Sequence, residues 1–202
     1  MISGGRRSRL RTLLAFVLTA SLSCAATAAE TPAWGIDQLM QDLAQVKTAK
    51  ARFVERKYLA MLNAPLDSSG TLVYTAPGRL EKYTRLPKPE ILVLDQDKLT
   101  IEYKDRGQRR TLALPDYPVI WAFVESIRST LAGDLPTLNR FYRASLAGSE
   151  EQWRLSLKPA DPKTQSVVKE IQIGGSRSRV RTIEIIEAEG DRSVMTITEE
   201  TQ

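Results

Sequence analysis

The sequence predicts a mainly β protein with a helical lid, in which one antiparallel sheet of about eleven strands curls round three helices. Three observations lead to this fold class. Apolar and polar residues alternate over much of the chain from Ala49 to Glu199, with the period of two typical of half-buried strands. Short segments rich in Gly, Pro and Asp separate these strands, and connections of that length require antiparallel neighbours. Two helical patterns interrupt the strands near the middle of the chain.

Composition excludes several kinds of catalytic site. The chain has 202 residues, of which 29 are Lys or Arg, 24 are Asp or Glu, one is Cys and none is His. Without histidine it cannot form a Ser-His-Asp or Cys-His catalytic arrangement or a histidine-ligated metal site. One cysteine cannot form an internal disulfide or the usual thiolate zinc cluster. We therefore expect a protein that is not an enzyme and has no metal or cofactor.

Residues 1–28 have the three parts of a secretory signal peptide. Four arginines between Arg6 and Arg11 precede a short apolar run at 13–20, and small residues follow up to Ala28. The apolar run is too short and too rich in Ser, Thr and Ala for a membrane span. We expect cleavage after Ala28, export of the mature protein, and a single domain over residues 29–202.

Three alternatives to this signal peptide stay open. The segment could remain as an uncleaved anchor. Lipidation of Cys24 is disfavoured because Ser21 stands where a lipidation signal has Leu, and Arg6-Arg7 could begin a twin-arginine signal. Removing four arginines from 29 basic residues leaves 25 against 24 acidic ones. The pI of about 9.4 therefore mostly reflects the export signal, and we expect no nucleic-acid partner.

The mature chain begins with one amphipathic helix and six strands. Apolar residues at Ile36, Leu39, Met40, Leu43 and Val46 have helical spacing. The period then changes to two, and Pro65 to Gly70 has the composition of a turn. The six predicted strands run from Ala49 towards Leu59 and over 71–76, 79–85, 91–94, 99–103 and 109–114.

Two helices and five strands complete the chain. Pro115 and Pro118 end the first series of strands, and a helix over 120–131 ends at Gly133. Asp134 is expected to cap a short third helix. The last strands are predicted over 142–147, 152–158, 167–174, 180–187 and 193–199.

The apolar face of such a sheet must be covered, and the three helices are the available cover. Two outcomes stay open at this point. The helices could fill the interior completely, or a strongly curved sheet could leave an apolar cavity. A closed eight-stranded barrel of the lipocalin type is the nearest rival fold, and it would place its main helix after the barrel rather than in mid-chain.

One stretch and the order of the elements resemble a known family. The stretch reads FVERK at 53–57, PLDSSGTLVY at 65–74 and PGRLEKYTRLP at 77–87. It resembles the LolA family of periplasmic outer-membrane lipoprotein carriers of Gram-negative bacteria, most closely a divergent LolA-related branch. The resemblance implies an incomplete antiparallel barrel of eleven strands lidded by helices, with an interior that holds acyl chains in transit from the inner to the outer membrane.

The same resemblance implies partners and a location. We expect a periplasmic monomer, loaded by an inner-membrane export complex and unloaded by an outer-membrane acceptor. Its cargo would be an acylated lipoprotein, a lipid or a glycolipid. The alternative is a half-barrel module that binds a partner protein at the envelope. The ligand-binding residues we expect are Phe53, Leu72, Tyr74, Leu80, Lys82, Ile101, Phe123, Ile127, Trp153, Leu155, Ile183, Ile185, Met195 and Ile197.

Two positions depart from the family pattern. Carriers of the family have an arginine before the proline matching Pro77, which latches the lid, whereas this chain has Ala76. They carry an aromatic residue where this chain has Lys82. Because Glu81 points to the other face of the strand, we expect Lys82 to face cargo or solvent, and a cargo with a negative group would then be preferred. The alternative is that Lys82 extends to the rim of the cavity.

Overall fold

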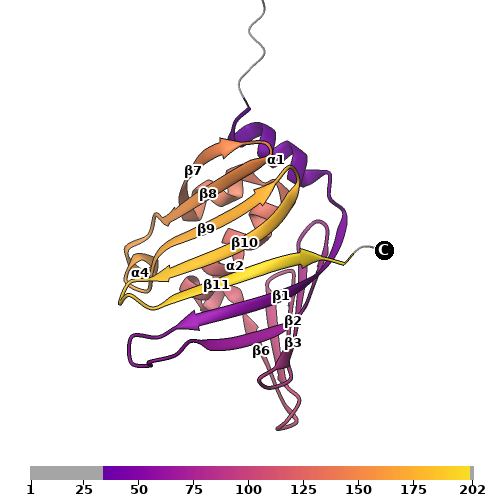
Figure 1. The fold of residues 1–202 in the computed structure, drawn as a ribbon, viewed down its shortest axis with the longest axis vertical. Coiled ribbons are helices and arrows are strands. Elements are labelled where there is room, and N and C mark those ends of the chain that lie inside the picture. Colours follow the sequence, from indigo (N-terminus) through magenta and orange to yellow (C-terminus); the bar gives the residue numbers. More distant parts are fainter. Residues whose placement is uncertain (1–33, 201–202) are drawn as a thin grey trace, which may run out of the picture. The chain divides into compact units, whose positions relative to one another are not determined.

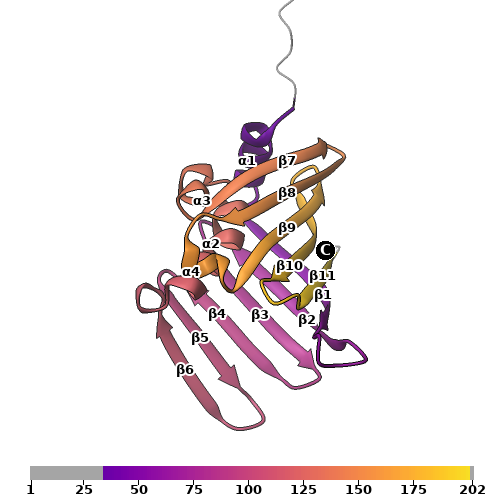
Figure 2. The same ribbon diagram turned by 90° about the vertical axis from the view of Figure 1, so that its left-hand side faces the viewer.

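A computed structural model of the protein describes residues 34–200. The predicted signal peptide, with Cys24, lies outside these residues. The described residues form one antiparallel sheet of eleven strands in the order β6-β5-β4-β3-β2-β1-β11-β10-β9-β8-β7 (Figures 1 and 2). The sheet is open, because its two edge strands β6 and β7 do not pair with each other. The predicted incomplete barrel with helices is confirmed, and the closed eight-stranded barrel is excluded.

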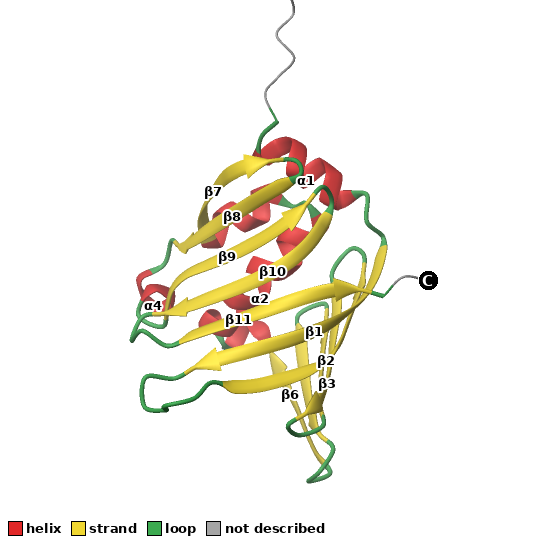
Figure 3. Ribbon diagram, in the orientation of Figure 1, coloured by secondary structure: helices red, strands yellow, loops and turns green. Residues whose placement is uncertain are grey.

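The order of elements follows the sequence prediction (Figure 3). The helices are α1 (Ile36–Ala44), the 3-10 turn η1 (Leu114–Asp116), α2 (Pro118–Ala132), α3 (Leu135–Phe141) and α4 (Pro162–Gln165). The strands are β1 (Thr48–Tyr58), β2 (Leu66–Thr75), β3 (Arg79–Leu86), β4 (Glu90–Asp95), β5 (Lys98–Tyr103), β6 (Gln108–Ala113), β7 (Tyr142–Ser149), β8 (Gln152–Pro159), β9 (Val168–Ser176), β10 (Arg179–Glu187) and β11 (Arg192–Glu199).

Helix α2 lies between the sixth and seventh strands, as predicted, and the residues at its two ends explain where it begins and stops. Pro118 occupies the first turn, where a missing N–H is tolerated. Gly133 ends the helix with a φ of +67°, and a Cβ there would lie 2.1 Å from the carbonyl oxygen of Met40 in α1. The glycine therefore serves both the turn and the close packing of α1 on α2. Asp134 caps α3 by accepting a hydrogen bond from the Thr137 N–H at 3.0 Å, which confirms that prediction.

One local prediction is wrong. Of residues 65–70, expected to form a turn, all but Pro65 begin strand β2, which pairs with β1 as far as Leu66 opposite Lys57. A long partner strand offers these small residues a full ladder of backbone hydrogen bonds, and this outweighs their turn preference. The short helix α4, between β8 and β9, is an addition to the predicted elements, and its Asp161 cap accepts a hydrogen bond from the Thr164 N–H at 2.8 Å.

Two apolar clusters cover the two ends of the sheet. We call the larger one the packed end; it joins α1, α2 and α3 to strands β7, β8 and β9, and its central members are Leu39, Met40, Leu43, Ala122, Leu138, Tyr142, Trp153, Leu155, Leu157, Val168, Ile171 and Ile173. The smaller cluster packs Val124 of α2 against Leu94, Leu99 and Leu114. Strands β3, β2, β1, β11 and β10 lie between the two clusters in the sheet order.

Over residues 34–200, no helix combines the length and the apolar character needed to cross a bilayer.

Candidate functional site

A cavity of about 560 Å³ lies over the middle strands of the sheet, between the two clusters. Its wall comes mainly from β1, β2, β3, β10 and β11, with side chains of β4 and β5 at one side, while Phe123, Val124 and Ile127 of α2 face it from the helical side. Leu43, in the last turn of α1, and Val46, just after that helix, also line the cavity. The volume falls within the range of small-molecule sites, and the wall is mainly aliphatic and aromatic. The arrangement is suited to holding an apolar chain.

Ten of the fourteen residues expected to bind a ligand lie around this cavity. Most of them are only half-buried although they face the inside of the sheet, because part of each side chain borders open space; Leu80, Phe123, Ile127, Ile183 and Ile185 also pack against the two clusters. These ten residues are Leu72, Tyr74, Leu80, Lys82, Phe123, Ile127, Ile183, Ile185, Met195 and Ile197.

The other four expected residues do not line the cavity. Trp153 and Leu155 are 2% and 0% exposed and belong to the packed end, where the Trp153 Nε1–H donates to the Arg177 carbonyl oxygen at 2.8 Å. Ile101 packs against the smaller cluster. Phe53 is 1% exposed, with its ring beneath Lys82. All four point to the inner face as the alternation predicts, but helices or other side chains cover them.

Sequence reasoning did not select several residues of the cavity wall. Glu55 and Ser193 add polar groups to it, and Leu92 and Val180 extend its apolar surface. Glu55 could have been found, because it follows Phe53 by two residues in the same strand and so shares its face.

One polar part of the wall is an ion pair between β1 and β3, and Lys50, Arg179, Glu199 and Glu200 add further charged groups elsewhere in the lining. Lys82 Nζ donates to Glu55 Oε2 at 2.7 Å, and its ammonium lies 4.8 Å from the centre of the Phe53 ring. Glu55 also accepts hydrogen bonds from the hydroxyls of Ser193, at 2.7 Å, and Ser68, at 3.3 Å. Burial opposes ionisation of Glu55, but the charge of Lys82 and these three hydrogen bonds together hold the pKa of Glu55 below its ordinary value.

The expectation that Lys82 would find only cargo or solvent is therefore wrong. Its partner comes from β1, two strands away, and not from its own strand. On the intervening strand β2, the positions nearest Glu55 and Phe53 are Ser68 and Gly70. Because these two residues are small, the long Lys82 side chain can cross β2 and reach Glu55.

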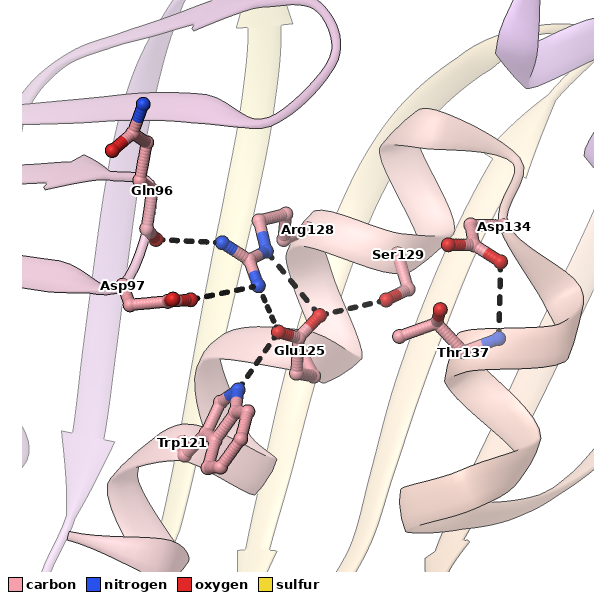
Figure 4. A network of polar contacts seen from close by, with 8 residues as sticks. All are labelled: Gln96, Asp97, Trp121, Glu125, Arg128, Ser129, Asp134 and Thr137. Carbon is pink, nitrogen blue, oxygen red and sulfur yellow. Dashed lines mark hydrogen bonds and ion pairs between the residues drawn. The ribbon is translucent and has the colours of Figure 1, made fainter. Parts of the chain in front are cut away.

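Helix α2 is attached to the rim of the sheet by a second polar network, shown in Figure 4. Arg128 Nη1 donates to the carbonyl oxygen of Gln96, in the β4–β5 turn, at 2.7 Å. Its guanidinium also bonds Glu125, which is 2% exposed. The Glu125 carboxylate accepts further hydrogen bonds from Trp121 Nε1, at 2.9 Å, and Ser129 Oγ, at 2.8 Å. A buried carboxylate with this many donors fixes the position of the arginine.

Arg128 also contacts the turn that lacks the latch arginine. A Cβ at Gly78, between β2 and β3, would lie 2.8 Å from Arg128 Cδ. The residue before Pro77 is Ala76, so the turn itself offers no charged side chain there. In this chain an arginine on the helix reaches the β2–β3 and β4–β5 turns.

The sequence from residue 26 to residue 199 matches the model of a family described as outer membrane lipoprotein carrier protein LolA-like. The chain belongs to this LolA-like family. The family description is that of a carrier. Among residues 34–200, no three Asp, Glu, His or Cys side chains lie close enough together to hold a metal ion.

Solved structures similar to this LolA-like protein are distant in sequence. A LolA superfamily protein from Nitrosomonas europaea is 8% identical, with a TM-score of 0.45 over 84% of this chain and 96% of that one. A DUF1329 family protein from Desulfovibrio piger is 10% identical, with a TM-score of 0.43 over 81% and 88%. A chain of the MucA/MucB complex of Pseudomonas aeruginosa is 14% identical, with a TM-score of 0.46 over 81% of this chain and 55% of that one. A search of curated protein sequences gives no match. The family assignment rests on the match over residues 26–199.

Proposed function

We propose that this LolA-like protein is an exported carrier that shields the acyl chains of a lipoprotein or lipid during transfer from the inner to the outer membrane. The observation that carries the proposal is the apolar cavity of about 560 Å³ over the middle of the sheet. Half-buried aliphatic side chains around an internal space leave apolar surface that an acyl chain would remove from water.

Release must be possible as well as capture. Burying one methylene group contributes roughly 0.8 kcal/mol, so a sixteen-carbon chain could contribute on the order of 12 kcal/mol before any opposing cost. A lid that closes when the carrier is empty lowers the net affinity by its opening cost. Helix α2 suits this role because it faces the cavity and is held to the sheet by polar contacts of Arg128.

A displacement titration with a fluorescent fatty acid tests the proposal. Wild type should bind saturably, while Phe123→Glu and Ile127→Glu should each weaken binding at least tenfold, since a carboxylate in the cavity wall must be desolvated. Val54→Glu is the matched control, because Val54 is 52% exposed and points away from the buried Phe53 face. Absence of saturable binding by wild type contradicts the proposal, as does unchanged binding by both helix variants.

Export is the second part of the proposal. N-terminal sequencing of protein recovered from the periplasm should begin at or near Ala29. Recovery of the folded protein from the membrane with Met1 intact would contradict cleavage.

A second candidate function is a module that binds a partner protein. Four exposed apolar side chains, Tyr58, Met61, Leu62 and Leu66, occur at the ends of β1 and β2 and in the loop between them, and exposed apolar surface in one region favours a protein contact. Substitution of Met61 and Leu62 by serine separates the two functions. It should abolish capture of a partner protein if the module is correct, and it should leave fatty-acid displacement unchanged if the carrier is correct.

A further inference from the structure

The Lys82–Glu55 pair places two charged groups among the leucines that β2, β3 and β4 contribute to the cavity wall, and it bears on which lipid the protein selects. Both side chains line the cavity, with 28% of the Lys82 and 18% of the Glu55 side chain exposed. They are therefore partly accessible from the cavity and not sealed within the core. Leu72, Leu80 and Leu92 lie beside them in the wall. A chain that lies against these leucines with its polar end towards Lys82 brings that end within reach of the pair.

We propose, on the basis of the carrier function proposed above, that this pair selects acyl ligands whose polar end is an uncharged ester or amide over those that end in a free carboxylate. The pair then acts as the specificity-determining group of the cavity.

Lys82 has enough N–H donors to bind an uncharged acceptor on the ligand while it stays paired with Glu55. An ammonium has three N–H donors, and Glu55 receives one of them at 2.7 Å. The Phe53 ring lies 4.8 Å from Nζ and offers a π face rather than a lone pair. A carbonyl oxygen of an ester or amide can accept a remaining N–H without disturbing the contact with Glu55.

The charge of Glu55 explains why a carboxylate is disfavoured. Glu55 balances the charge of Lys82 and is fixed by Ser193 and Ser68, so it does not readily move away. A second carboxylate at Lys82 would lie beside Glu55 in a partly desolvated site, where like charges repel strongly. This arrangement reverses the preference for negative cargo that the sequence alone suggests for Lys82.

Two ligands with the same acyl chain test whether the pair prefers an uncharged ester to a carboxylate. They are palmitate, which carries a carboxylate, and monopalmitoyl glycerol, which carries a neutral ester. The measured quantity is the ratio of their affinities in displacement titrations at pH 7.5 and low salt. In Glu55→Gln the unpaired Lys82 should favour palmitate, and the palmitate-to-ester ratio should rise about tenfold or more, as expected for one hydrogen bond between charged groups. In Lys82→Met the uncompensated Glu55 should lower the same ratio.

Opposite changes in the two variants are the signature of the pair, and either variant alone suffices if the other does not fold. Glu184→Gln is the control, because Glu184 pairs with Arg192 and alternates with the cavity residues Ile183 and Ile185; its ratio should stay within twofold of wild type. An unchanged ratio in both cavity variants, with both ligands still bound, overturns the inference and leaves the carrier function intact. Failure of wild type to bind either ligand overturns the carrier function itself.

Discussion

The packed end and the middle of the sheet use the same strand pattern but have different interiors. In β8 and β9 the inward residues Leu155, Ile171 and Ile173 are at most 1% exposed. In the neighbouring strand β10, Ile183 and Ile185 pair with Ile173 and Ile171 across the sheet, yet they remain half-buried beside the cavity. The difference comes from the helices: α1 and α3 pack on β7–β9 (Figure 2), whereas α2 faces the middle strands across the cavity. Uneven helical cover thus creates the cavity.

Truncating one leucine in each region should give the largest contrast. Leu155→Ala removes a fully buried side chain from the packed end and should lower the free energy of unfolding by about 2–5 kcal/mol. Leu80→Ala, at a half-buried position that already borders open space, should cost less than about 2 kcal/mol. Urea denaturation of both variants measures the two values. Equal losses would mean that the cavity is filled in solution and that the two regions do not differ.

Removing the arginine that holds α2 should have an intermediate effect. Arg128→Met loses the hydrogen bond to Gln96 and leaves Glu125 buried without its cation, for a loss of about 1.5–3 kcal/mol. Hydrogen exchange should accelerate in α2 (Pro118–Ala132) more than in β8. Arg177→Met is the control, since Arg177 bonds the exposed Glu151 and such surface pairs contribute little. Uniform acceleration throughout the chain would contradict a local role for Arg128.

Acidification should produce the smallest of these effects, a difference in stability between wild type and the Glu55→Gln variant of the cavity wall. The pKa of Glu55 lies below its ordinary value of 4.5 in the folded protein. Its ionised form therefore adds stability above pH 4.5, and this contribution is lost as the pH falls through the lower, folded-state pKa. Between pH 5 and pH 3 wild type should lose more stability than Glu55→Gln in parallel thermal unfolding scans. Parallel losses in the two proteins would show that Glu55 is not held ionised by Lys82.

The sequence predicts the arrangement of strands better than it predicts the cavity. Alternation placed Leu155 and Ile183 on the same inner face, which is correct, but it carries no information about which of them a helix covers. Phe123 and Ile127 were selected because helix spacing and flanking prolines marked α2 as the mid-chain cover, and both do border the cavity. The partner of Lys82 was missed because Glu55 lies 27 residues earlier, on β1, and the alternation within one strand does not reveal the register of β1, β2 and β3 that brings the two side chains together.

The local error at residues 65–70 has the same origin. Pro65, Ser68, Ser69 and Gly70 have turn preferences taken alone, and only the eleven-residue partner strand β1 makes an extended conformation favourable. Small side chains at Ser68 and Gly70 then let Lys82 cross β2. A segment that resembles a turn in sequence thus permits the ion pair of the cavity wall.

Mass spectrometry of an organic extract from protein purified out of the periplasm tests the central claim most directly. If the cavity over β1–β3 and β10–β11 carries acyl chains, wild type should yield acylated lipid near one molecule per protein, and Leu80→Trp, which fills the cavity, should yield much less. Absence of lipid from wild type, or equal amounts in both proteins, would contradict the account of this cavity as the cargo site.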